Sequence, residues 1–207
     1  MSDTCSTCGT ELETPLCCTS CGALFELQGR PTAHELFGLP NGFAIDLHDL
    51  RKRLRRFGRC LHPDFFATAE PRLRELAERN SAALNEAYEV LADDARRADD
   101  LVRRLGGPGE DTERQMPQEF LLEVLEWNEA LEEARAGGDD AELDALEATL
   151  ATRRADTLTE VTRLLDPLPE AGAPELTEVR RHLNALRYLD KTLVQIRELR
   201  LERANTR

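Results

Sequence analysis

The sequence predicts an all-α protein with a small cysteine-rich module at its N-terminal end. Aromatic residues make up only 5% of the 207 residues, and Leu, Ala, Glu and Arg, which favour helices, prevail. Apolar residues recur at intervals of three and four along most of the chain, as on one face of an α-helix. Five of the six cysteines fall within residues 5–21, so a separate module is expected there.

The first segment, residues 1–30, contains two Cys-x-x-Cys-Gly sequences with nine residues between Cys8 and Cys18, a workable spacing for a tetrahedral site of four thiolates. Each glycine permits the tight turn that brings two sulfurs onto one ion. We expect one structural zinc ion, with iron or redox chemistry of the thiols as alternatives. Cys17 could replace Cys18, although the symmetric spacing favours Cys18. The expected ligands are Cys5, Cys8, Cys18 and Cys21.

The middle segment, residues 31–109, is expected to be helical and to end at a run of Gly and Pro. Thr32 can cap a short first helix and Asp46 the next one. Along that second helix the apolar and the basic residues fall on opposite faces. The apolar set is Leu47, Leu50, Leu54, Phe57 and Leu61, and the basic set is His48, Lys52, Arg55, Arg56 and Arg59. A third helix can pack antiparallel against the second because the loop between them is short.

His62, Pro63 and Asp64 stand between these two helices. Pro63 opposes helix continuation and pre-sets a turn, so His62 and Asp64 project from a rigid corner. As ordinary turn residues they could form an accidental loop, but their position after a basic amphipathic helix argues against it. The sequence shows no nucleophile at a recognisable spacing, and Cys60 near the apolar flank is expected to be inert. We therefore expect no enzymatic activity.

A short helix, a helix with a basic face, His-Pro-Asp and a long antiparallel helix together resemble a J domain. In that family the tripeptide and the basic face contact a DnaK-type chaperone and trigger its ATP hydrolysis. The resemblance implies a DnaK-type (HscA-like) ATPase chaperone as partner, contacted by His62, Pro63, Asp64, Lys52, Arg55, Arg56 and Arg59. A cationic cluster gives fast, salt-sensitive association with an acidic groove. The alternative for the basic face is a merely solvated helix side.

The last segment, residues 110–207, predicts three long helices in a bundle, with breaks at Gly137-Gly138 and at residues 167–174. The first of these helices has one stripe suited to the bundle core, and on its other side leucines are framed by glutamates. Such a side indicates a docking patch with an apolar centre and an acidic rim, unless another helix covers it. Its members are Leu121, Leu122, Leu125, Glu126, Glu129 and Glu133.

This helical C-terminal segment narrows the resemblance to HscB-type co-chaperones, because generic J proteins continue with Gly/Phe-rich and β-sandwich regions. Three motifs carry it: Glu35 to Pro40 (ELFGLP), Leu84 to Leu91 (LNEAYEVL) and Leu186 to Lys191 (LRYLDK). The resemblance implies delivery of an iron-sulfur scaffold protein (IscU-like), with Tyr188 joining the scaffold-binding face. Another client, or an ordinary exposed tyrosine, is the alternative. Phe65 departs from the family pattern, which usually has lysine there.

The net charge of −13 is unevenly distributed. Residues 1–30 carry four acidic and one basic residue, residues 31–109 carry thirteen of each, and residues 110–207 carry twenty-three acidic and thirteen basic residues. The acidic last segment disfavours nucleic acid as a partner, which also counts against a nucleic-acid-binding cysteine module on a dimerisation bundle. Without a long apolar run or a signal-peptide pattern, we expect no membrane partner and a cytoplasmic location.

Overall fold

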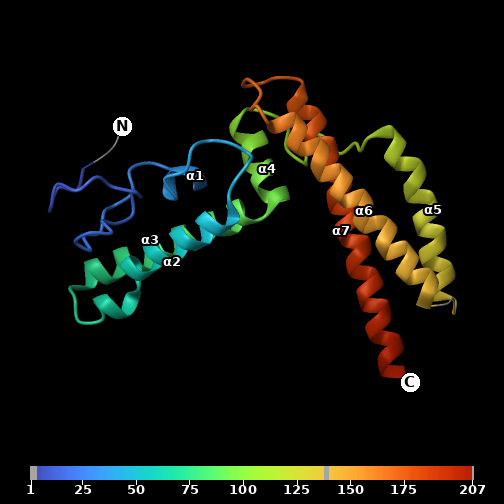
Figure 1. Ribbon diagram of the computed structural model, residues 1–207, viewed down its shortest axis with the longest axis horizontal. Helices are drawn as coiled ribbons and strands as arrows, with labels where there is room; N and C mark the ends of the chain where they lie inside the picture. Colours follow the sequence, from blue (N-terminus) through green and yellow to red (C-terminus); the bar gives the residue numbers. More distant parts are fainter. Residues whose placement is uncertain (1–3, 138–139, 207) are drawn as a thin grey trace. The chain divides into compact units, whose positions relative to one another are not determined.

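The computed structural model describes residues 4–137 and 140–206 and divides into two compact units, Met1–Arg97 and Ala98–Arg207 (Figure 1). Within the described ranges the regular secondary structure consists of helices, apart from two isolated β-bridges in the cysteine segment. The all-α prediction is thus confirmed. The division into domains 1–30, 31–109 and 110–207 stays a prediction, and in the structure the cysteine segment belongs to the same unit as the helices after it.

The first two helices of the first unit start at the caps that the sequence predicts. The Thr32 hydroxyl accepts from the Glu35 amide and the Glu35 carboxylate accepts from the Thr32 amide (2.7 Å), while the Asp46 carboxylate caps the next helix. The elements are α1 (Ala33–Leu36), α2 (Leu47–Leu61), the 3-10 helix η1 (Pro63–Phe66), α3 (Pro71–Ala92) and α4 (Asp94–Arg104), which contains the boundary between the units.

The expected antiparallel hairpin is formed by α2 and α3, which pack side by side (Figure 1). Their apolar stripes share one core with α1, and the cysteine segment adds two residues to it. The core includes Leu36 and Phe37 from α1, Leu50, Phe57 and Leu61 from α2, Leu84, Ala87 and Leu91 from α3, and Leu16 and Cys17 from the cysteine segment. Leu47 is an exception to its predicted stripe, because it lies in the first turn of α2 and is exposed.

The sequence did not predict a helix break at Asp93, where α3 ends and α4 begins. Asp93 adopts an extended conformation, and its carboxylate accepts from the Arg96 amide at 2.8 Å, so a new helix starts there. Arg97 is buried and donates to the backbone oxygen of Phe43 (2.8 Å), over whose ring its guanidinium lies. These contacts fix the end of the hairpin to the loop before α2.

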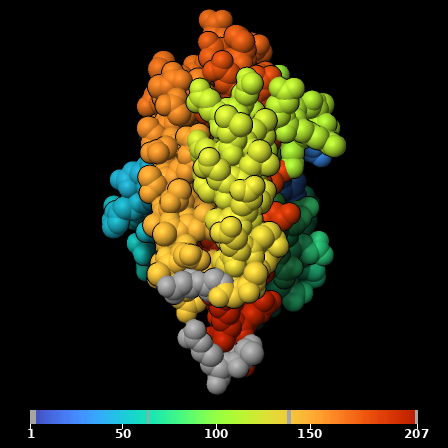
Figure 2. All heavy atoms as spheres, turned by 90° about the vertical axis from the view of Figure 1, so that its right-hand side faces the viewer, coloured from blue at the N-terminus to red at the C-terminus, as the bar shows by residue number. Residues whose placement is uncertain are grey.

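The second unit is the expected three-helix bundle of α5 (Gln118–Arg135), α6 (Asp140–Leu165) and α7 (Glu175–Thr206). Figure 2 shows α5 and α6 side by side on one face. Phe120, Trp127, Leu131 and Ala134 of α5 are buried in its core, as the stripe predicted. Gly138 of the predicted Gly137-Gly138 break lies outside the described residues. None of the described helices has the length and apolar character that crossing a lipid bilayer requires.

Candidate functional site

The structure brings together the four cysteines predicted as metal ligands. The sulfur atoms of Cys5, Cys8, Cys18 and Cys21 all lie within 4.8 Å of one another. Cys5 Sγ is 3.6 Å from Cys21 Sγ, and Cys8 Sγ is 3.6 Å from Cys18 Sγ. A tetrahedral zinc ion with bonds of about 2.3 Å holds its sulfur ligands about 3.8 Å apart, so this donor set fits a metal ion of that kind.

The two Cys-x-x-Cys-Gly turns have matching backbone hydrogen bonds. The Gly9 amide donates to the Cys5 carbonyl at 2.8 Å, and the Gly22 amide donates to the Cys18 carbonyl at 2.9 Å. Both glycines have a left-handed φ, 74° and 77°, which residues with a Cβ rarely adopt. Each turn therefore depends on its glycine to present two sulfurs to the same point.

The neighbouring thiols Cys17 and Cys60 lie outside the four-sulfur cluster. Cys17 is packed in the core of the first unit, and this burial raises the pKa of its thiol, which keeps it a poor metal ligand. A hydrogen bond to the Thr10 hydroxyl (3.4 Å) lowers the pKa of Cys8 to about 6, whereas desolvation and hydrogen bonds to the neighbouring thiols raise the pKa of Cys21. Cys60 is half-buried, and its thiol donates to the Cys18 carbonyl at 3.3 Å.

The cysteine module is attached to the helices by specific polar contacts that the sequence did not reveal. The buried Asn80 of α3 donates from Nδ2 to the carbonyls of Leu16 and Phe25, both at 2.9 Å. The Thr14 hydroxyl donates to the Leu36 carbonyl at 2.8 Å. Because buried carbonyls without a donor are costly, these contacts fix the module to α1 and α3.

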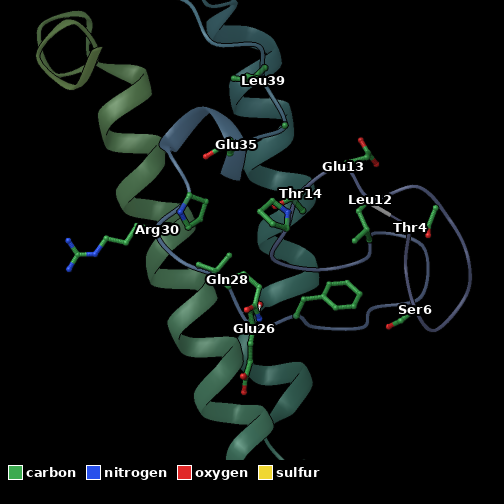
Figure 3. A pocket seen from close by; sticks show the side chains of 15 residues that line it. Thr4, Ser6, Leu12, Glu13, Thr14, Glu26, Gln28, Arg30, Glu35 and Leu39 are labelled. Atoms are coloured by element: carbon green, nitrogen blue, oxygen red, sulfur yellow. Dashed lines mark hydrogen bonds between the residues drawn. The ribbon is translucent and has the colours of Figure 1, made fainter. Parts of the chain in front are cut away.

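A cavity of about 960 Å³ lies between the module and α1 (Figure 3). Leu12 and Leu39 contribute to its apolar lining. Its three carboxylates already have partners within the first unit. Glu13 pairs with Arg56, Glu26 pairs with Arg72 (2.9 Å), and Glu35 closes the capping box. The lining therefore offers no unpaired carboxylate to a ligand.

The His-Pro-Asp corner is exposed at the end of α2. The side chain of Asp64 is 88% accessible, and His62 is also exposed, whereas Leu61 just before them is fully buried. His62 Nδ1 accepts from the Asp64 amide at 3.3 Å, which joins the two residues of the corner. Pro63 begins η1 with its backbone, and its side chain lies outside the described residues. Phe65 follows, 73% exposed.

The predicted cationic face of α2 is also exposed. It contains Lys52, Arg55, Arg56 and Arg59. Arg56 pairs with Glu13 of the cysteine module. Among the described residues the other three cations form no ion pair, so their charge is available to a partner. Arg53, between them in sequence, points elsewhere and donates to Asp49 (2.7 Å) and to the Phe37 carbonyl (3.1 Å).

The predicted leucine and glutamate patch on α5 is not covered by another helix of the bundle. Leu122 and Leu125 are 70% and 62% exposed, and Leu121 is 46% exposed. Glu126, Glu129 and Glu133 are also exposed. An apolar surface of this kind without a covering element is typical of a protein-binding site.

Tyr188 of α7 is half-buried beside this patch. Its hydroxyl donates to Asn128 Oδ1 of α5 at 2.8 Å, and its ring lies edge-on to Phe120, with centroids 5.9 Å apart. The sequence predicted an outward-facing side chain, and the structure shows that its ring also packs against the bundle core. Tyr188 therefore connects α7 to the helix that carries the leucines.

Comparison with known proteins gives concordant matches. A family model described as the HSCB C-terminal oligomerisation domain matches residues 116–197. The co-chaperone protein HscB homolog of Burkholderia thailandensis is 36% identical over 142 residues, 68% of this chain and 81% of that protein. The HscB homolog of Burkholderia mallei is 34% identical with the same coverage.

Two solved structures are similar along most of the chain. The crystal structure of human co-chaperone protein HscB gives a TM-score of 0.78 and covers 97% of this chain and 100% of that one, at 23% identity. At that identity the match supports the fold alone. Chaperone HscB from Vibrio cholerae gives a TM-score of 0.69 at 28% identity, with 83% and 99% of the two chains covered.

Proposed function

The chain belongs to the HscB family of co-chaperones, and from this we propose that it joins two partners in iron-sulfur cluster biogenesis. Its first unit stimulates ATP hydrolysis by a DnaK-type chaperone of the HscA kind, and its second unit delivers an iron-sulfur scaffold protein of the IscU kind. The observation that carries the proposal is the exposed His-Pro-Asp corner at the end of a cationic helix.

The chaperone contact follows from charge and rigidity. Lys52, Arg55 and Arg59 are exposed and form no ion pair among the described residues, and their positive charge accelerates association with an acidic surface. The corner is held by the buried Leu61 on one side and by the turn of η1 on the other. A contact site that is already ordered loses little conformational entropy on binding.

The scaffold contact follows from the patch on α5. Burial of an exposed leucine contributes about 1.5–3 kcal/mol, so Leu122 and Leu125 supply the main apolar gain. Glu126, Glu129 and Glu133 surround them and require a partner with basic residues at its rim. Tyr188 extends the apolar surface toward α7.

The four-cysteine centre is assigned to one structural zinc ion. The ion would cross-link the two turns, and four protein ligands leave no open position for a substrate. Cys5, Cys8, Cys18 and Cys21 would hold it as thiolates. The reduced thiols that this requires suit a reducing compartment such as the cytoplasm.

Steady-state ATP hydrolysis by a purified DnaK-type chaperone tests the chaperone contact. We expect the parent protein to stimulate turnover several-fold and Asp64→Asn to lose the stimulation. Asp64 is too exposed for the change to affect the fold, which a thermal melt will verify. Asp156→Asn, the same change at an exposed residue of α6, should stimulate as the parent does. Failure of the parent to stimulate, or full stimulation by Asp64→Asn, would refute the proposal.

A further inference from the structure

The segment between α4 and α5 contains no helix, yet side-chain contacts fix it along α7. The side chain of Asn184 donates hydrogen bonds to two backbone carbonyls of this segment. The contacts are Asn184 Nδ2 to the carbonyls of Glu113 (3.0 Å) and Gln115 (2.8 Å), and the ion pairs Arg181–Glu113 (3.2 Å) and Arg187–Glu110. The segment is therefore a wall of the second unit rather than a loose tether.

A cavity of about 510 Å³ lies between this wall and α7. Met116 and Tyr188 contribute apolar lining, and both pack against the bundle core. A cavity of this size falls in the range of about 300–1,000 Å³ that is common for binding sites, and it can take a short segment of a partner.

The cavity is positively charged within an acidic part of the chain. Arg187 is neutralised by its ion pair with Glu110. Arg114 and Lys191 also line the cavity, and neither forms an ion pair among the described residues. Against them stands the carboxylate of Asp111, so one positive charge remains in excess. Residues 110–207 as a whole have ten more acidic than basic residues, so this local excess has the opposite sign to its surroundings.

Tyr188 lies between this cavity and the α5 patch. Tyr188 lines the cavity, and its hydroxyl donates a hydrogen bond to Asn128 of α5. Asn128 is three residues from Leu125 and therefore on a neighbouring position of the same helix surface. Figure 2 shows parts of α7 exposed beside α5. The apolar patch thus has acidic residues on α5 and a cationic cavity beyond Tyr188.

We propose that this cavity receives an acidic segment of the same client that binds the α5 patch. The inference rests on the proposed function, and it adds a second contact of opposite charge. Carboxylates of the client would form charge-assisted hydrogen bonds with Arg114 and Lys191, while neighbouring apolar atoms would lie against Met116 and Tyr188. Two contacts of opposite sign on either side of an apolar centre fix the orientation in which the client docks.

Calorimetric titration of a purified iron-sulfur scaffold protein into the full-length protein tests the inference. We expect Arg114→Glu and Lys191→Glu each to weaken binding about tenfold, because each replaces an attraction by a repulsion. Arg74→Glu, a matched change at an exposed position of α3, should leave the affinity unchanged. Leu125→Ser should weaken binding through the α5 patch alone.

The outcomes separate the inference from the function on which it rests. Loss of binding in Leu125→Ser with parental affinity in both cavity variants would overturn the cavity contact and leave the function standing. Absence of binding by the parent would overturn both. Equal weakening by Arg74→Glu would reduce the effect to overall charge and overturn the inference. Inorganic phosphate binding that depends on Lys191, with unchanged client affinity, would assign the cavity to a free anion instead.

Discussion

The two units stabilise their folds in different ways. The second unit buries long apolar stripes from three helices, such as Phe120 and Trp127 against Leu189. The first unit is built on a helical hairpin, but part of its core comes from a segment with almost no regular secondary structure. Leu16 and Cys17 enter that core next to four clustered thiols. A short segment of this kind gains most of its order from a bound metal.

The surfaces proposed for docking in the two units also have opposite charges. The α2 surface is cationic, and the α5 surface is acidic with exposed leucines at its centre. On the proposed function, a basic partner rim that suits the glutamates of α5 is disfavoured at the cationic face of α2, because like charges at an interface cost binding energy. The difference shows how the two proposed sites on one small chain can each select a different partner.

Removal of the metal should have the largest effect, and it should lower the stability of the first unit only. Structural zinc contributes about 10–16 kcal/mol to folding in small zinc modules, so chelation should detach the cysteine segment from the hairpin. We expect the thermal midpoint of the first unit to fall by about 10 °C or more while that of the second unit stays constant. Differential scanning calorimetry with and without a chelator measures both.

Cys60→Ser provides the control for that experiment. Cys60 contacts the Cys18 carbonyl but lies outside the four-sulfur cluster, so the variant should keep one metal ion per chain and a similar midpoint. An equal loss of stability in both units after chelation would contradict the contrast, as would a first unit that is indifferent to the metal.

Replacing the exposed leucines of α5 should have the next largest effect, and it should weaken only the binding of the client. With about 1.5–3 kcal/mol for each buried leucine, the double change Leu122→Ser and Leu125→Ser should weaken client binding about a hundredfold or more. Stimulation of the chaperone without client should not change. The matched variant Leu201→Ser removes an exposed leucine from α7 and should bind the client normally. Client affinity and ATP turnover are measured on the same preparations, and parallel loss of both would refute separate surfaces.

Raising the salt concentration should have the smallest effect on binding, and it should weaken binding at the α2 surface more than at the α5 surface. Exposed charges are screened over about 8–10 Å at physiological ionic strength, so docking through α2 weakens as salt rises. We expect the co-chaperone concentration that gives half-maximal stimulation to increase several-fold between low and high salt. The affinity for the client should change less, because the α5 surface has an apolar centre. Removing one cation by Arg55→Ala should flatten the salt dependence of stimulation. Identical salt dependence of both partners would remove the proposed difference.

Local patterns predicted those parts of the molecule that local interactions determine. The caps Thr32 and Asp46, the faces of α2 and the paired cysteine turns follow from residue types at short spacing, and the structure contains each of them. The attachment of the module was missed because it depends on distant pairs. Asn80 reaches the Leu16 carbonyl across 64 residues, and no periodicity encodes that contact.

The remaining differences have the same origin. The sequence left open whether another helix covers Leu122, because coverage depends on how the three helices are placed in the bundle. The linker before α5 has a loop composition, yet Asn184 and Arg181 bind it from about 70 residues away. Long-range polar contacts of this kind require the fold before they can be identified.

If one molecule delivers the client to the chaperone, both surfaces must act on the same chain. Chaperone ATP turnover is measured with client present, first with the parent protein and then with an equimolar mixture of Asp64→Asn and the variant with Leu122→Ser and Leu125→Ser. We predict a joint stimulation by the parent that exceeds the effects of co-chaperone and client alone, and its absence in the mixture, because neither variant can bind both partners. Full joint stimulation by the mixture would contradict delivery by a single molecule.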